Sequence, residues 1–260
     1  MYYSKYYRML SEDNIVLVYQ MGKVGSSSIT SSLEKIDIKS LHIHSLYKNR
    51  GYALFKKFLL AKKYYFLYKR ILLSVFYLWQ RLKLHKHKNL KIITLVREPI
   101  SVNISSFFHN LSYFAYEFEQ NATSSIAESF FEKFNNDYTL DWFDTEWFPT
   151  IGVDVYKYDF NKEAGYSIIK EKNIECLIIK LEKLDELEAV IADFVGNDQF
   201  KLLNSNISTE KWYNSVYQDF KNNVKLSPEF IDRMYSSKLV QHFYSSKEID
   251  GFRSKYLKSK

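Results

Sequence analysis

One stretch, residues 15–29, constrains the fold of this chain more than any other. A short run of β-branched and apolar residues passes through two glycines and a lysine into three serines and a helix-forming segment. The pattern predicts a strand that leads through a tight loop to a helix N-terminus, where unpaired backbone N–H groups favour an anion. Glycine lets the backbone approach a ligand, lysine adds a positive charge, and serine adds hydroxyl donors. The expected cradle for a phosphate-type anion comprises Gly22, Lys23, Val24, Gly25, Ser26, Ser27 and Ser28.

Two other interpretations of this loop stay open. Serine is a preferred N-cap residue, so Ser26 could belong to an ordinary strand-to-helix turn. The loop is not a Walker A motif, because Lys23 precedes the second glycine instead of following it. A kinase or ATPase is therefore a weaker interpretation than a transferase that uses another phosphorylated donor.

The composition favours one globular domain in a reducing compartment. With 260 residues and 46% hydrophobic side chains the chain can bury a core, and 7 glycines and 3 prolines argue against long flexible linkers. Cys176 is the one cysteine; it excludes an intramolecular disulfide, and its apolar neighbours indicate a buried strand. No ligand cluster for a metal is evident. The N-terminus lacks the apolar core of a signal peptide, and residues 71–80 are too few to span a bilayer, so a soluble cytoplasmic protein is expected.

The net charge of +7 is concentrated in one part of the chain. Residues 38–97 contain 15 Lys or Arg and no Asp or Glu. Within this block, aromatic and apolar residues at spacings of three and four predict a basic helical insertion at about 50–89. Residues 51–89 could contact an anionic membrane surface or a glycan, or they could pack on the domain as helices with solvated lysines. No specific nucleic acid is expected as a partner; nonspecific binding would show a steep salt dependence.

A second strand is expected over residues 38–44, and its alternation places His42 and His44 on one face. A histidine here, close after the anion loop, is a candidate general base in a cleft at the carboxyl ends of the strands. Each histidine could instead be structural, or the two could bind a metal, although no third ligand is evident. His44 lies nearer the strand end.

Residues 90–96 form a nearly continuous apolar run, which predicts a buried strand of a parallel sheet. Arg97-Glu98-Pro99 follows, and residues 100–108 are expected to form a helix with Pro99 near its first turn. An arginine at the strand end, with Ser105 two helical turns further on, can bind a second phosphate.

The second half of the chain is expected to complete the sheet and cover it. Residues 113–148 are aromatic and acidic, and we expect them to be helical and to wall an acceptor cleft. Strands are expected over residues 154–158 and 176–181, and a helix over residues 185–195 that stops at Gly196. A polar loop over residues 204–213 is expected to lead into C-terminal helices.

Taken in order, these segments resemble the sulfotransferase superfamily that uses 3′-phosphoadenosine-5′-phosphosulfate (PAPS) as donor. Within it, the chain is similar to a bacterial branch of capsular polysaccharide synthesis proteins with a C-terminal Asn-Lys-Trp-Tyr-Ser-type signature. Residues 22–28 look like the 5′-phosphosulfate loop, and Arg97 with Ser105 looks like the 3′-phosphate motif. Later segments of that branch are similar to residues 180–184, 210–215, 242–245 and 248–249.

The resemblance implies a P-loop-like three-layer α/β/α sandwich with a central parallel sheet, formed by residues 1–260 as a single domain. It implies transfer of a sulfuryl group from PAPS to a hydroxyl of a glycan, in a capsular or cell-surface polysaccharide or its precursor, without a metal. The long basic insertion is not a general feature of the superfamily. The expected location is the cytoplasm, where the protein could also contact the inner face of the membrane as a peripheral protein.

The resemblance also implies roles for single residues. His44 is the favoured base and His42 the second candidate, while the carboxylates of Glu34, Asp144 and Glu146 are substitutes for a histidine base.

On the donor side, Lys23 and the serines at 26–28 would stabilise charge on the leaving phosphate. Arg97 and Ser105 would anchor the 3′-phosphate, and Lys211 would add a contact from the C-terminal loop.

Two rival functions from other classes stay open. A non-catalytic glycan- or membrane-binding module on the same fold would bind the donor without turnover. A P-loop-type kinase would depend on ATP and magnesium instead.

Overall fold

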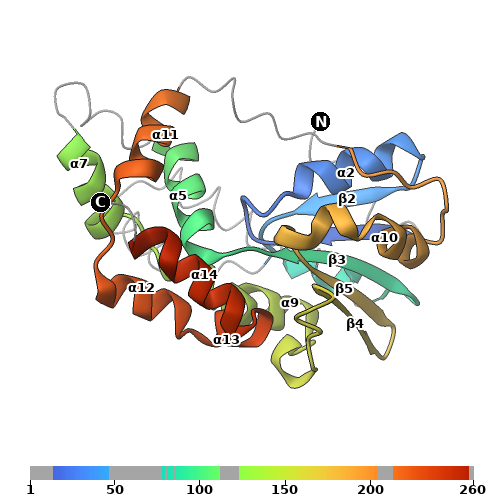
Figure 1. Ribbon diagram of the computed structural model, residues 1–260. Coiled ribbons are helices and arrows are strands. Elements are labelled where there is room, and N and C mark those ends of the chain that lie inside the picture. The colour runs from blue at the N-terminus through green and yellow to red at the C-terminus, as the bar shows by residue number, and fades with distance from the viewer. Residues whose placement is uncertain are drawn as a thin grey trace, which may run out of the picture.

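The fold is an α/β sandwich built on a mixed sheet (Figure 1). Described residues of this computed structural model are 14–46, 78–79, 81–84, 86–111, 123–203 and 213–257. Their strands stand in the order β2-β1-β3-β5-β4, with bounds β1 Val16–Tyr19, β2 Ser40–Ile43, β3 Leu90–Val96, β4 Tyr166–Glu171 and β5 Ile174–Lys180. β1 pairs in parallel with β2 and β3, and β3 with β5, whereas β4 is antiparallel to β5. The α/β prediction is confirmed, and β4 adds an antiparallel edge to the parallel sheet.

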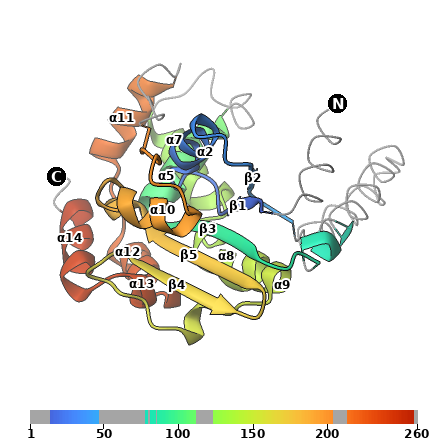
Figure 2. The ribbon, with the colours of Figure 1, turned by 90° about the vertical axis from the view of Figure 1, so that its right-hand side faces the viewer.

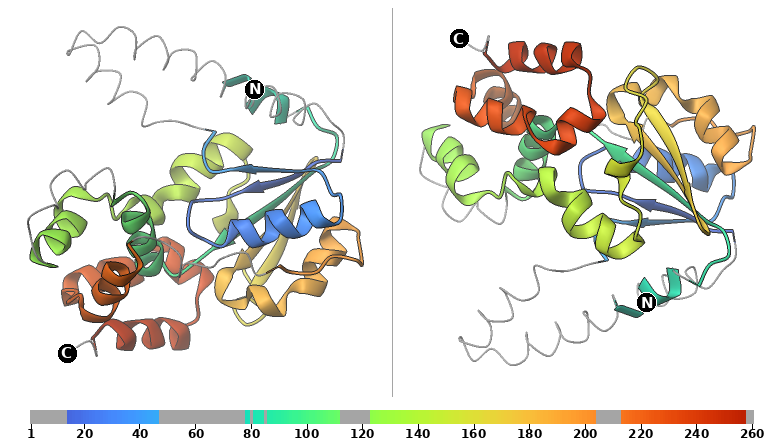
Figure 3. Two further views of the ribbon diagram at one scale, coloured as in Figure 1. Left: turned by 90° about the horizontal axis from the view of Figure 1, so that it is seen from above. Right: turned by 90° about the horizontal axis from the view of Figure 1, so that it is seen from below.

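Helices cover both faces of the sheet (Figures 2 and 3). On one face lie α2 (Ser26–Lys35) and α10 (Glu188–Val195), and on the other lie α8 (Tyr138–Trp142), η3 (Phe143–Trp147) and α9 (Phe148–Ile151). Every residue of β1 is buried, and so is all of β3 apart from the half-buried Lys91. Burial on both faces explains why continuous apolar runs predicted these strands.

The position of β1 places a crevice at one end of the sheet. β1 lies between β2 and β3, so the next two strands of the chain are added on opposite sides of it. In α/β sheets, ligands bind outside the carboxyl ends of the strands where the strand order reverses in this way. The loop that follows β1, residues 21–25, begins at that place.

Several elements have the predicted bounds. α2 begins at Ser26 and ends at Lys35, and β3 spans Leu90–Val96, both as predicted. The helix expected after Arg97 is α5 (Pro99–His109), with Pro99 as its first residue. The strand expected over residues 38–44 is confirmed but shorter, since β2 ends at Ile43.

One strand prediction in the second half of the chain is wrong, and one helix begins later than expected. Residues 154–158 do not form a strand: Val155–Lys157 is a 3-10 helix (η4), because the Asp154 carboxylate accepts a hydrogen bond from the Tyr156 N–H at 3.1 Å and closes a turn. The strand in this region is β4, which the sequence analysis missed. The helix expected over residues 185–195 begins later, at Glu188, after the 3-10 helix η5 (Leu181–Glu186), and it ends before Gly196 as expected.

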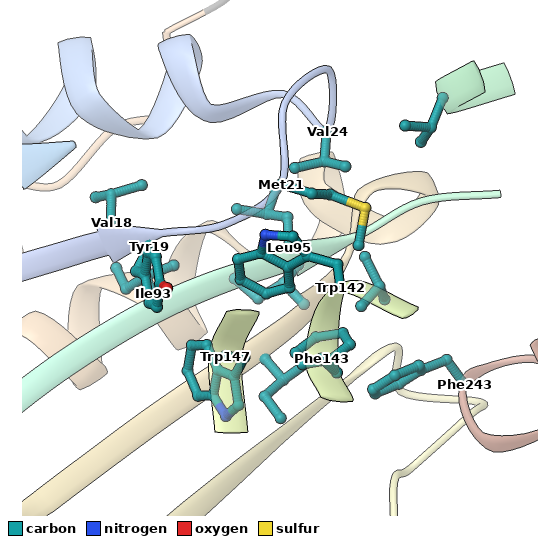
Figure 4. Close-up of a cluster of buried hydrophobic side chains, with 14 of the residues drawn as sticks. Val18, Tyr19, Met21, Val24, Ile93, Leu95, Trp142, Phe143, Trp147 and Phe243 are labelled. Carbon is teal, nitrogen blue, oxygen red and sulfur yellow. The ribbon is translucent and has the colours of Figure 1, made fainter. Parts of the chain in front are cut away.

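The aromatic segment before Gly152 is helical as predicted, from α7 (Thr123–Glu128) and the π-helix η2 (Ser129–Lys133) through α8, η3 and α9. Its tryptophans belong to the core and not to a cleft wall. The ring centroids of Trp142 and Trp147 lie 5.3 and 5.7 Å from that of Tyr19, and both side chains are fully buried. Figure 4 shows them packed with Phe143 under β1 and β3.

The expected C-terminal helices are α11 (Asn214–Asn223), α12 (Pro228–Tyr235), α13 (Lys238–Phe243) and α14 (Ser246–Leu257). They pack against α5: the ring of Tyr217 on α11 lies 5.4 Å from Phe108, and Tyr256 Oη on α14 lies 3.1 Å from Ser101 Oγ. Buried Tyr235 of α12 donates a hydrogen bond to Glu98 at 2.9 Å, so this helix also contacts the turn before α5.

Two predictions lie largely or wholly outside the described residues. Of the insertion at about 50–89, the structure describes a helical piece, residues 78–79 and 81–84, and the turn before β3. Lys211 lies outside the described part of the chain. Among the helices that are described, none is long and apolar enough to cross a membrane.

Candidate functional site

A pocket of about 720 Å³ lies at the carboxyl ends of β1 and β2. It is bounded by the loop after β1, the two histidines at the end of β2, one face of α5, and the residues that lead into α8. Its lining consists of Met21, Gly22, Lys23, Gly25, Ser26, Ser27, His42, His44, Val102, Asn103, Ser106, His109, Asn110, Phe134, Asn135, Tyr138 and Thr139.

The backbone of the loop turns sharply into α2. Lys23 and Gly25 both have positive φ, 69° and 89°, a conformation that glycine adopts readily and lysine adopts under strain. A Cβ at Gly25 would also meet the end of the Leu181 side chain, which would have to move to make room. The guanidinium of Arg97 donates a hydrogen bond from Nη1 to the Lys23 carbonyl at 2.9 Å and holds this turn in place.

The N-terminus of α2 has no side-chain cap among the described residues. Gly25 is its N-cap residue, and the first turn contains no acidic side chain. The first N–H groups of the helix and its positive dipole end therefore face the pocket beside Ser26, which favours an anion.

The corresponding turn after β3 is built in the opposite way. The Glu98 carboxylate caps α5, accepting hydrogen bonds from the N–H groups of Ile100 at 2.7 Å and Ser101 at 2.8 Å. A carboxylate already occupies the place where an anion would bind. Of these two strand-to-helix turns, the first is the one suited to an anionic ligand.

The predicted cradle residues divide into two groups. Gly22, Lys23, Gly25, Ser26 and Ser27 line the pocket, as predicted from their place in the loop. The buried side chains of Val24 and Ser28 are not part of the lining. Figure 4 shows Val24 with Met21 above the aromatic cluster.

The two histidines lie together at the pocket, as the strand alternation predicted. Their ring centroids are 4.4 Å apart, and His44 Nδ1 is 3.1 Å from the Gln20 carbonyl oxygen. When Nδ1 carries the proton it donates to that carbonyl, and Nε2 is then left as an acceptor. Burial, and secondly the charge of His44, lowers the pKa of His42 to about 4, so His42 is neutral at ordinary pH. His44 is the more exposed of the two side chains.

A third histidine, His109 of α5, also lines the pocket. Within the described ranges, no three His, Cys, Asp or Glu side chains gather closely enough to hold a metal ion.

None of the three carboxylates considered as substitute bases lines the pocket. Glu146 is buried and accepts hydrogen bonds from Tyr19 Oη at 2.7 Å, Ser45 Oγ at 3.0 Å and the Leu46 N–H. It therefore fixes the segment that follows His44. Asp144 pairs with Lys238 at 3.0 Å, and Glu34 is exposed on α2.

Arg97 and Ser105 do not line the pocket. Ser105 lies on α5 roughly a quarter turn away from the face that carries Val102, Asn103 and Ser106, at 3.6 residues per turn. The predicted second anion group thus lies beside the pocket, on the side of α5 that faces the C-terminal helices.

The structure adds two lysines near Arg97 that sequence analysis did not single out. Burial lowers the pKa of Lys255 on α14. The negative charge of Glu98 raises this pKa, whereas the positive charges of Lys221 on α11 and of Arg97 lower it. Lys221 and Arg97 therefore both lie close enough to Lys255 to act on its charge. Their positions in sequence carry no local signal, because helix packing alone brings them together.

Together, the fold and the pocket define an α/β protein whose strand–loop–helix turn and histidine pair share one pocket at the carboxyl ends of parallel strands. A family model for NKWYS, putative capsular polysaccharide synthesis protein, matches residues 115–245, just over half of the chain. The chain belongs to this family. No significant match was found among curated proteins or among solved structures.

Proposed function

We propose that this protein is a PAPS-dependent sulfotransferase that transfers a sulfuryl group to a hydroxyl of a glycan in capsular polysaccharide synthesis. The observation that carries the proposal is that the N-terminus of α2, which has no side-chain cap, and His44 line one pocket. The helix end can bind the anionic reacting group, and the histidine can act as a base towards the acceptor hydroxyl. The family name supports the capsular pathway.

The two cationic regions support a donor with two separated anionic groups. The loop of Lys23 and the α2 N-terminus suits the 5′-phosphosulfate, and the cations beside α5, with Ser105, suit the 3′-phosphate. Arg97 links the regions through its bond to the Lys23 carbonyl. A guanidinium has five N–H donors, and this bond uses one of them.

In the proposed reaction, the acceptor hydroxyl oxygen bonds to sulfur while the bond from sulfur to the phosphate oxygen breaks. The electron pair stays on that phosphate oxygen, and the hydroxyl proton passes to Nε2 of His44. Lys23 and the N–H groups of the α2 N-terminus stabilise the charge that develops on the leaving phosphate. We also propose that the protein acts in the reducing cytoplasm, at the inner face of the membrane. The basic segment proposed to contact this membrane includes residues 51–77, which lie outside the described part of the chain.

The first experiment is a thermal-shift and calorimetric titration with 3′-phosphoadenosine-5′-phosphate, with ATP and magnesium in parallel. The bisphosphate is expected to stabilise the protein by about 2.7 kcal/mol at a hundredfold excess over Kd. Lys23→Ala and Arg97→Ala are expected to abolish the shift. Lys157→Ala, at an exposed site on η4, is the matched control and should behave as the wild type.

The three outcomes separate the candidate functions. Stabilisation by the bisphosphate supports the sulfotransferase. A shift with ATP and magnesium alone would favour the kinase. No shift with either would leave a binding module on this fold as the better interpretation.

A further inference from the structure

The part of the pocket wall formed by α5 and by the residues before and within α8 contains no Asp, Glu, Lys or Arg among the described residues. From α5 it presents Asn103, Ser106, His109 and Asn110, and from the segment before and within α8 it presents Phe134, Asn135, Tyr138 and Thr139. Among all the described lining residues there is no Asp, Glu or Arg, and the one lysine, Lys23, belongs to the loop on the donor side. The acceptor side therefore offers amides, hydroxyls, the imidazole of His109 and aromatic rings.

Hydrogen bonds hold this wall in a fixed geometry. Thr139 Oγ1 donates to Asn103 Oδ1 at 2.6 Å, and Asn103 Nδ2 donates to the Asn136 carbonyl at 2.8 Å, which ties α8 to α5. Asn110 Nδ2 donates to the Ser106 carbonyl at 2.8 Å. Hydroxyl and amide groups positioned in advance can recognise the hydroxyls of a sugar at little ordering cost.

The charge of this wall decides which sugars it can accept. A uronate carboxylate brought out of water against it would find no arginine or lysine to pair with, and a protonated amino sugar would find no carboxylate. An uncharged sugar has no ionic group that must be removed from water. The rings of Phe134 and Tyr138 can cover its apolar C–H face. The pocket volume of about 720 Å³ lies within the range of small-ligand sites.

We infer that the acceptor is an uncharged sugar bearing a free hydroxyl, and not a uronic acid or a sugar with a free amine. The inference rests on the proposed function for its reaction, but the pocket's preference among sugars is a separate property that binding alone can test.

The test is saturation-transfer-difference NMR with four probes in the presence of 3′-phosphoadenosine-5′-phosphate. Methyl β-D-glucopyranoside and methyl β-D-galactopyranoside are the neutral probes, and methyl β-D-glucuronide and D-glucosamine carry a negative and a positive charge. The neutral glycosides are expected to bind about tenfold more tightly than either charged probe, a ratio that corresponds to about 1.4 kcal/mol. Tyr138→Ala is expected to weaken the neutral glycosides.

A charge-introducing variant makes the test specific. Asn135→Lys adds a cation to the exposed rim of the wall and is expected to admit methyl β-D-glucuronide. Asn223→Lys, on the exposed end of α11 and outside the lining, is the matched control and should leave the selectivity unchanged.

Failure of this inference and failure of the proposed function are distinguishable. Selective binding of the neutral glycosides without any binding of the bisphosphate would keep the inference and remove the donor. Binding of the bisphosphate while the charged probes bind as well as the neutral ones, or while no sugar binds, would overturn the inference and keep the donor.

Discussion

The turn after β1 depends on single residues. Lys23 adopts a positive φ that costs a non-glycine residue of order 1–3 kcal/mol, and Arg97 holds that conformation through the Lys23 carbonyl. Strain of this kind persists only where the surroundings enforce it, and it occurs often at ligand sites. In this loop it turns the backbone so that α2 begins directly at the pocket.

We predict that Gly25→Ala destabilises the protein by about 1–3 kcal/mol, because the added Cβ meets Leu181 and the backbone φ is 89°. Gly22→Ala is the matched control in the same loop, since a Cβ there would meet no atom within 4 Å. Urea denaturation of both variants measures the difference. Equal losses in the two would contradict the assigned role of Gly25.

For His44 we predict a loss of turnover without a loss of donor binding. His44→Gln removes the proposed base and is expected to reduce sulfuryl transfer by roughly 10²–10⁴. His42→Gln should reduce it less, because a neutral side chain in contact with His44 positions the ring and does not take the proton. Transfer from PAPS to the glycosides named above, with bisphosphate binding measured alongside, checks this. A larger loss in His42→Gln would assign the base to His42.

The lowered pKa of His42 makes a prediction about stability and pH. The folded protein holds this pKa at about 4 against 6.5 for the unperturbed group, so between these values the unfolded chain binds more protons. The stability that depends on neutral His42 is complete above about pH 6.5 and is lost as the pH falls towards 4. The midpoint of urea unfolding, measured at several pH values, should fall less steeply in His42→Gln than in the wild type. Parallel curves would show that His42 titrates normally.

The loop, the histidine pair and Arg97 could be predicted because each follows a strand directly, and local patterns reveal where buried strands end. Lys221 and Lys255 could not be predicted, since two helices far along the chain must pack on α5 before these side chains meet Arg97. Ser105 had the right spacing for a second phosphate, but its place beside the pocket and not inside it depends on how α5 is rotated.

For the strands, burial on both faces explains which predictions from the sequence are confirmed and which are wrong. β1, β3 and β5 are continuous apolar runs under helices, and the sequence pattern predicted all three. β4 is an edge strand of mixed exposure, so it lacks that pattern, while the apolar residues near Val155 suggested a strand where an aspartate closes a turn. Within residues 113–148, Trp142 and Trp147 fill the core under β1, while Phe134, Asn135, Tyr138 and Thr139 line the pocket.

Glu146 links the helices under the sheet to the segment that follows β2, and we predict that its loss destabilises the protein. Glu146→Ala would remove this acceptor from Tyr19, Ser45 and the Leu46 N–H. Tyr19 keeps the Glu146 carbonyl and Thr150 Oγ1, so we expect a loss of about 1–3 kcal/mol, mainly from the buried Leu46 N–H. Glu146→Gln keeps the shape and one acceptor oxygen and is expected to lose less. Urea denaturation compares the two. If the Gln variant lost as much as the Ala variant, the negative charge and not the hydrogen bonds would be what matters.

Across the whole chain, α5 separates the two parts of the proposed donor site. One side of it faces the pocket, and the other receives α11 and α14 with their lysines. The family match, residues 115–245, covers the part of the pocket wall before and within α8 and the helices α11 to α13, whereas the loop, the histidine pair and the α5 part of the wall precede it. The loop and the histidine pair of the site could thus be predicted from local sequence pattern, whereas the contribution of the later helices depends on how they pack.

The ion pair between Lys180 and Glu248 joins the end of β5 to α14 and allows a final prediction. Lys180 Nζ is 2.5 Å from Glu248 Oε1 with its side chain fully buried, whereas the pair of Lys170 and Glu175, at 2.8 Å, has a lysine that is 75% exposed. The two carboxylates are exposed almost equally, at 28% and 27%, so burial of the lysine is the main difference.

Glu248→Gln is expected to destabilise the protein by about 3 kcal/mol, because it leaves a buried charge without its partner. Glu175→Gln should cost at most about 1 kcal/mol, as for other solvent-exposed pairs. In the double variant Lys180→Met/Glu248→Gln the buried charge is gone, so part of the stability should return. Urea denaturation of the wild type, of Glu248→Gln, Glu175→Gln and Lys180→Met, and of the double variant measures this. A double variant whose loss of stability equals the summed losses of Lys180→Met and Glu248→Gln would show that the pair is not coupled.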